Sequence, residues 1–63
     1  MLKNVLWFEV RYDVDDVEPR VIEGRNAEYR AYQLADRLAE KNGADYLVYA
    51  ITEHGEKFCG TNA

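Results

Sequence analysis

The stretch LKNVLWFEVRYDV, residues 2–14, alternates between two kinds of side chain at almost every step. Its even-numbered positions are apolar or aromatic except for Asn4, whereas its charges stand at odd-numbered positions. Successive side chains of an extended strand point to opposite faces of a sheet, so a period of two predicts a long first strand. The predicted core face of this strand consists of Leu2, Asn4, Leu6, Phe8, Val10, Tyr12 and Val14.

A second strand is predicted directly after the first. Asp15 and Asp16 are turn residues, because their carboxylates can satisfy bent backbone, and residues 17–23 follow as the returning strand of a hairpin. Pro19 lacks the amide hydrogen that a ladder of strands requires. We therefore expect this second strand at an edge of the sheet.

Residues 27–42 have the pattern of an amphipathic helix. Asn26 is a favourable N-cap in front of it, and Gly43 is the expected C-terminal stop. Apolar positions spaced three and four apart predict the side that packs on the sheet. This predicted stripe consists of Ala27, Ala31, Leu34, Ala35, Leu38 and Asn42.

The C-terminal part of the chain predicts two more strands. Residues 45–53 are rich in strand-forming side chains, and of its two apolar faces we expect Leu47, Tyr49 and Ile51 to point inward. His54 and Gly55 predict a tight turn into a short strand over residues 56–59, and residues 60–63 are expected to fray.

Together these elements predict a single α+β domain over residues 1–63. Short, unknotted connections favour an antiparallel sheet of three to four strands, in the sequence β-β-α-β-β and the order 2-1-3-4, with the helix packed on one face. A chain of 63 residues has room for one small core and for little else.

The charge balance of the chain bears on its partners and its location. Twelve acidic and eight basic residues give a net charge of -4, which argues against direct binding to nucleic acid and fits a basic protein partner. The alternative is that this charge only keeps a small protein soluble. One cysteine, Cys59, excludes an internal disulfide, and no apolar run is long enough for a signal peptide or a membrane span. We therefore expect a cytoplasmic protein.

The sequence offers little for catalysis. His54 and Cys59 are the only residues of their types, so we expect no metal cluster, and their pairing would lack an orienting third group. The glycines are isolated, which excludes a glycine-rich phosphate loop. We expect no catalytic site and no cofactor, with an enzyme built on His54 and Cys59 as the least favoured alternative.

Two surfaces are candidates for binding a partner. Carboxylates spread over one surface can imitate the phosphates of a duplex and occupy a basic nucleic-acid channel, although an ordinary solvated turn is the alternative for the hairpin acids. The candidate acids are Asp13, Asp15, Asp16, Glu18, Asp36 and Glu40.

The second candidate surface is the side of the sheet that one helix leaves uncovered. Trp7 is its expected anchor, with Val5, Tyr46, Val48 and Ala50 pointing outward beside it. Alternatively, the last strand or a second copy of the chain covers this side, so we expect a monomer or a homodimer.

The segment LWFEV, residues 6–10, and the segment AYQLA, residues 31–35, in an acidic chain of this size resemble small phage-encoded inhibitors. These include anti-CRISPR proteins of type I systems and phage proteins that shut down host enzymes, and the similarity covers residues 2–53. The resemblance implies an inhibitor that acts in the host cytoplasm, binds a CRISPR effector complex and blocks its DNA-binding surface. The alternative is a non-catalytic interaction module, antitoxin-like, regulatory or host-enzyme-inhibiting, that uses the Trp7 side of the sheet.

Overall fold

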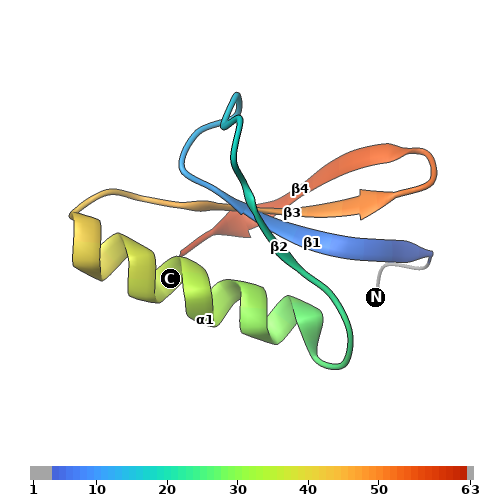
Figure 1. Ribbon diagram of the computed structural model, residues 1–63, viewed down its shortest axis with the longest axis horizontal. Coiled ribbons are helices and arrows are strands. Elements are labelled where there is room, and N and C mark those ends of the chain that lie inside the picture. The colour runs from blue at the N-terminus through green and yellow to red at the C-terminus, as the bar shows by residue number, and fades with distance from the viewer. Residues whose placement is uncertain (1–3, 63) are drawn as a thin grey trace.

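The computed structural model describes residues 4–62 and has one helix packed on a four-stranded antiparallel sheet (Figure 1). In chain order the elements are β1 (Val5–Arg11), β2 (Arg20–Ile22), α1 (Ala27–Asn42), β3 (Leu47–Thr52) and β4 (Gly55–Thr61). The sheet order is β2-β1-β3-β4, so the predicted α+β fold and strand order are confirmed. Leu2 and Ala63, assigned above to the core face and to the tail, lie outside the described residues.

Strand β1 is shorter than the predicted strand over residues 2–14. Asn4 precedes it with a φ of 60°, and after Arg11 the chain turns through residues 12–19 before β2 begins. Tyr12 and Val14, which were predicted in the core, are exposed. The run of aspartates in this segment favours a turn over a strand, because their side chains satisfy bent backbone.

A β-bulge at Leu6 changes which side chains of β1 reach the core. The two steps from Val5 to Trp7 on β1 match a single step on β3. An extra residue of this kind interrupts the alternation of the strand. As a result Leu6, predicted in the core, is 53% exposed, whereas Val5, predicted on the outer side, packs against the core.

Strand β2 is confirmed as an edge strand but has only three residues, Arg20–Ile22, instead of the seven predicted over residues 17–23. It begins directly after Pro19, which has no amide hydrogen to donate to β1. The chain before Pro19 belongs to the loop, so Val17 and Glu18 are not part of the sheet.

Helix α1 has the predicted bounds. At its end Gly43 adopts a φ of 65°, which glycine tolerates best, and its amide donates to the Ala39 carbonyl at 2.8 Å. At its start the expected side-chain cap is not formed: Asn26 has a φ of 57°, and its carbonyl accepts the first helical hydrogen bond from the Arg30 amide. Asn42, predicted on the buried stripe, is exposed and donates to the Tyr46 hydroxyl.

The prediction for the inward face of β3 was wrong. Val48 pairs with Val10 and Ala50 pairs with Phe8, and paired residues share a face of the sheet, so Val48 and Ala50 point to α1. Tyr49 is also buried, but on the opposite face. The core consists of Phe8, Val10, Ala31, Ala35, Leu38, Val48 and Ala50.

Strand β4 is longer than predicted and is held at its end. It runs through Thr61 after a two-residue turn at positions 53–54, and it contains a second bulge at Cys59. The Asn62 amide donates to the Tyr46 carbonyl at 3.0 Å, and the Tyr46 amide donates to Asn62 Oδ1 at 2.7 Å. Residues 60–62 are therefore tied to the start of β3, and the expected fraying was wrong for them.

Candidate functional site

Helix α1 covers one side of the sheet, and within residues 4–62 no helix covers the other side (Figure 1). We call this other side the open face. The register of the strands places on it Val21, Trp7, Glu9, Arg11, Leu47, Tyr49, Ile51, Glu56 and Phe58. The prediction of an uncovered side that carries Trp7 is thus correct, but the predicted neighbours were wrong: Val48 and Ala50 are part of the core, and Val5 and Tyr46 pack against it.

A charged network occupies the centre of the open face. The Arg11 guanidinium lies 2.7 Å from Glu9 Oε1 and 3.0 Å from Glu56 Oε2, and its carbon lies 4.1 Å from the centre of the Tyr49 ring. Trp7 Nε1 donates to the second oxygen of Glu9 at 2.8 Å. Hydrogen bonding to Glu56 and then to Glu9 outweighs burial and raises the pKa of Arg11.

This pairing makes Arg11 compatible with a covered surface. Arg11 is only 8% exposed, yet both of its terminal nitrogens have carboxylate partners, and NH1 also donates to the Val14 carbonyl at 3.4 Å. A partner protein that covered this part of the face would therefore not bury an unpaired charge, which would be strongly destabilising.

Apolar side chains surround the network. Phe58 is 53% exposed and packs edge-on against Tyr49, with 5.5 Å between ring centres. Val21 is exposed at the β2 edge, and Trp7 and Ile51 are half-buried. Aromatic residues that are partly exposed on the uncovered face of a sheet are typical anchors for a protein partner.

The loop of residues 12–18, which we call the acidic loop, rises on the side of the sheet away from α1 (Figure 1). It carries four of the six predicted acids: Asp13, Asp15, Asp16 and Glu18. The structure therefore brings these four acids to the same side as Trp7. Its link to the network is the hydrogen bond from Arg11 to the Val14 carbonyl.

Asp16 differs from the other acids of the loop because it is a structural residue. Its carboxylate accepts hydrogen bonds from the Tyr12 and Glu18 amides, each at 2.9 Å. These two bonds, that from Tyr12 first, lower the pKa of Asp16. Asp16 holds the loop, whereas Asp13, Asp15 and Glu18 are exposed.

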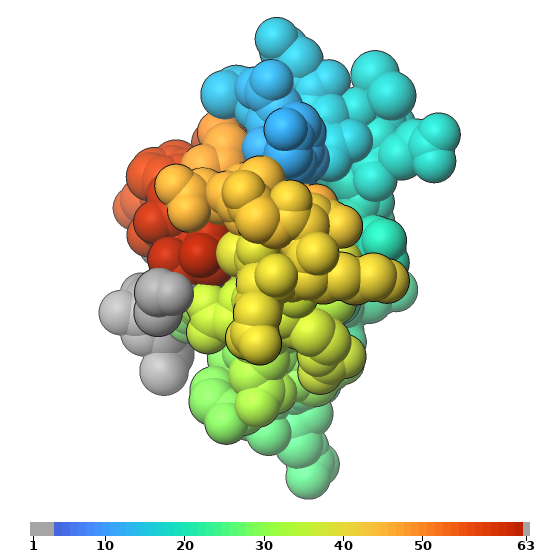
Figure 2. Space-filling view, turned by 90° about the vertical axis from the view of Figure 1, so that its left-hand side faces the viewer, coloured from blue at the N-terminus to red at the C-terminus, as the bar shows by residue number. Residues whose placement is uncertain are grey.

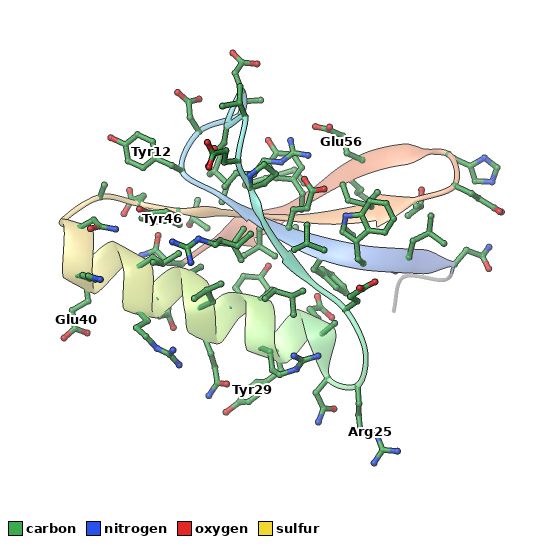
Figure 3. All side chains as sticks on the ribbon, in the orientation of Figure 1. Tyr12, Arg25, Tyr29, Glu40, Tyr46 and Glu56 are labelled. Carbon is green, nitrogen blue, oxygen red and sulfur yellow. The ribbon has the colours of Figure 1, made fainter. Side chains whose placement is uncertain are left out.

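The other two predicted acids lie elsewhere. Asp36 and Glu40 are exposed on α1, and Figure 3 shows Glu40 pointing away from the sheet, on the side opposite Glu56. Figure 2 views the molecule from the end of α1: the acidic loop lies at the top, the segment after α1 lies below it, and the helix extends further down. The six acids thus form two groups rather than one surface.

The helix acids border a depression at the C-terminal end of α1. It has a volume of about 630 Å³ and is open to solvent. Its lining is Asp36, Ala39, Glu40, Gly43, Ala44, Asp45 and Asn62.

The residues considered for catalysis stand apart. His54 is exposed in the turn before β4 and lies 3.5 Å from Glu53, whereas Cys59 is half-buried near the other end of the strand. The extended chain between them spans about 16 Å. Burial, followed by the charge of Glu28, raises the pKa of the Cys59 thiol, which disfavours the reactive thiolate.

Sequence reasoning missed the Glu9–Arg11–Glu56 network and the exposed Phe58. Trp7, Glu9 and Arg11 alternate on one side of the first strand, which was a usable signal for a polar patch beside the tryptophan. The contribution of β4 depended on its register with β3, which the sequence did not show.

The chain matches no protein-family model, no curated protein and no solved structure. Within residues 4–62, no helix has the length and apolar character needed to cross a membrane.

Proposed function

We propose that the protein is a non-catalytic interaction module that binds a protein partner through the open face. The observation that carries this proposal is the one-sided packing of the sheet, which leaves Phe58 and Val21 exposed on the same face as the half-buried Trp7. A small domain gains nothing in solubility from aromatic side chains held on an uncovered face of its sheet.

The chemistry of the open face supports binding rather than a reaction. Its carboxylates Glu9 and Glu56 are bonded to Arg11, and its aromatic rings are fixed by their neighbours. Rigid aromatic side chains lose little conformational entropy on binding, and the paired charges add specificity at the centre of the contact.

The experiment is affinity capture with the full chain as bait from a bacterial lysate, followed by affinity measurements on the captured protein. Replacing both Phe58 and Val21 with serine should lower the affinity at least about tenfold, the effect expected of anchor residues. Tyr29→Ser is the matched control, because Tyr29 is 66% exposed and lies on α1, on the opposite side of the molecule (Figure 3). Equal losses in both variants would contradict the proposal.

A second candidate function is an anti-CRISPR-like inhibitor that blocks the DNA-binding surface of a CRISPR effector complex. The observation that favours it is the position of Asp13, Asp15 and Glu18, which are exposed on the open-face side of an acidic protein. Acids in this position would meet the basic groove of a nucleic-acid-binding partner, as DNA phosphates do. Asp36 and Glu40 would not take part in this contact.

A purified type I CRISPR complex tests this candidate. The double variants Asp13→Lys/Asp15→Lys and Asp36→Lys/Glu40→Lys change the net charge by the same amount. Only the loop variant should lose binding and inhibition of DNA binding, and the affinity of the unaltered protein should fall steeply with salt. Binding that is insensitive to salt, or equally sensitive to both variants, would exclude the mimicry.

A further inference from the structure

The acidic loop presents apolar side chains at its surface. Val17 is 91% exposed, and Val14 and Tyr12 are more than half exposed. A single exposed apolar side chain is normal on a protein surface, but here three occur within one short loop that stands clear of the sheet (Figure 1), and exposed apolar side chains that are grouped are typical of interaction sites.

The backbone that carries these side chains is fixed. The Asp16 carboxylate accepts from the amides of Tyr12 and Glu18, on the two sides of the loop, and the Asp16 amide donates to the Asp13 carbonyl at 3.1 Å. Arg11 holds the Val14 carbonyl from below. A loop that is ordered before binding loses less conformational entropy on contact with a partner.

We infer that the acidic loop is a projecting contact element, and that Val17 enters an apolar pocket of the protein partner that is bordered by lysine or arginine side chains. This inference rests on the proposed function and extends it. The apolar side chain of Val17 requires an apolar pocket on the partner. The flanking carboxylates of Asp13, Asp15 and Glu18 require positively charged side chains around that pocket. The same carboxylates are repelled by the phosphates of nucleic acid and by anionic lipid headgroups, so a protein is the partner that fits.

A phage-displayed library of random peptides, selected against the immobilised full chain, provides a probe of known composition. Selected peptides should combine lysine or arginine with large apolar residues. Val17→Ser should weaken the binding of these peptides about tenfold or more. The same binding is measured for Phe58→Ser on the open face and for Tyr29→Ser on α1 as comparison variants. Val17 is almost fully exposed, so its replacement leaves the core untouched.

Each outcome decides the inference. Peptides that depend on Val17 support it. Peptides that depend on Phe58 but not on Val17 overturn it and leave the proposed open-face function standing. Peptides that depend on Tyr29 alone, or a selection that yields no binders, overturn both. A second measurement tests the order of the loop: slow amide exchange at Tyr12 and Glu18 that becomes fast in Asp16→Ala supports a fixed element, and fast exchange in the unaltered protein contradicts it.

Discussion

Gly60 gives Tyr32 the room to lie between α1 and β4. A Cβ atom at position 60 would stand 2.8 Å from the Tyr32 hydroxyl oxygen, closer than real contacts allow. Burial also raises the pKa of this hydroxyl, in keeping with its enclosed position. The sequence offered no sign that this glycine serves a helix two elements away.

We expect Gly60→Ala to lower the free energy of unfolding by about 1–2 kcal/mol, because the tyrosine must shift to admit the methyl group. In a Tyr32→Phe background, which lacks the hydroxyl, the same substitution should have a smaller effect. Urea unfolding of the four proteins in this double-mutant cycle measures the coupling. Purely additive effects would show that the contact is unimportant.

The second residue-scale prediction concerns pH. The pKa of Asp16 is lower in the folded protein than in the unfolded chain, so between the two values the unfolded chain binds more protons, and stability decreases as the pH is lowered. The contribution of Asp16 is therefore complete at neutral pH and declines once the pH drops below about 4. Asp16→Asn should be less stable than the unaltered protein at pH 7, and the difference should shrink at pH 3. Asp15→Asn, an exposed acid of the same loop, is the control.

At the scale of the elements, Arg11 joins the two strands that flank β3. It stands on β1, bonds Glu9 on its own strand and reaches across Tyr49 to Glu56 on β4. Glu9 is almost as enclosed as Arg11, whereas the Glu56 side chain is 51% exposed. Loss of the Arg11–Glu9 pair and loss of the Arg11–Glu56 pair should therefore change the free energy of unfolding by different amounts.

Arg11→Met should lower the free energy of unfolding by about 2–3 kcal/mol, because Glu9 then keeps a buried charge without a cation. Glu56→Gln should lower it by less than about 1 kcal/mol, since water replaces an exposed ion pair at little cost. Thermal and urea unfolding measure both variants. A larger effect for Glu56→Gln would mean that the cross-sheet bond, rather than the pair on β1, holds the network.

The elements also show how far the sequence reaches. The end of α1 was predictable because Gly43 terminates the helix by local chemistry, whereas Asn26 marks its start without the side-chain cap that the prediction assumed. The inward face of β3 was not, because Val48 and Tyr49 are both suited to burial and only the pairing with β1 decides between them. The bulge at Leu6 had no local signal, since neither glycine nor proline marks it.

The candidate site was also predictable only where the sequence carries a local signal. Trp7 stood out as an aromatic residue on the face with the charges, and the acids of residues 13–18 stood out by density. Whether Asp36 and Glu40 join them depended on which side of the sheet the helix covers. That is set by the packing of the whole chain, and the structure places them away from the loop.

For the whole molecule, one core serves every element. Side chains of β1, α1 and β3 form a single buried cluster, and β2 and β4 complete it with partly buried neighbours such as Ile22 and Cys59. No part of it can be removed without exposing the rest, so a small domain of this kind should unfold in one step.

The single tryptophan provides a test of this cooperativity. Trp7 lies on the open face, outside the core cluster, while far-ultraviolet circular dichroism reports mainly α1 on the other side. Urea transitions followed by the two signals should coincide, with an m-value of about 1 kcal/mol/M for a chain of this size. An earlier fluorescence transition would show that the open face opens on its own.

The place of β1 in the middle of the sheet determines when, during synthesis, this strand obtains both of its pairing partners. Its neighbours are β2, which follows within the same hairpin, and β3, which begins at Leu47. A ribosome that has delivered the chain as far as Asn42 has therefore delivered VLWFEVR with one edge of its backbone unpaired and with two of the seven core residues, Val48 and Ala50, still missing. The nascent chain therefore carries VLWFEVR with one unpaired edge until β3 emerges, and the charges of Glu9 and Arg11 within that strand oppose its pairing with other chains during this time.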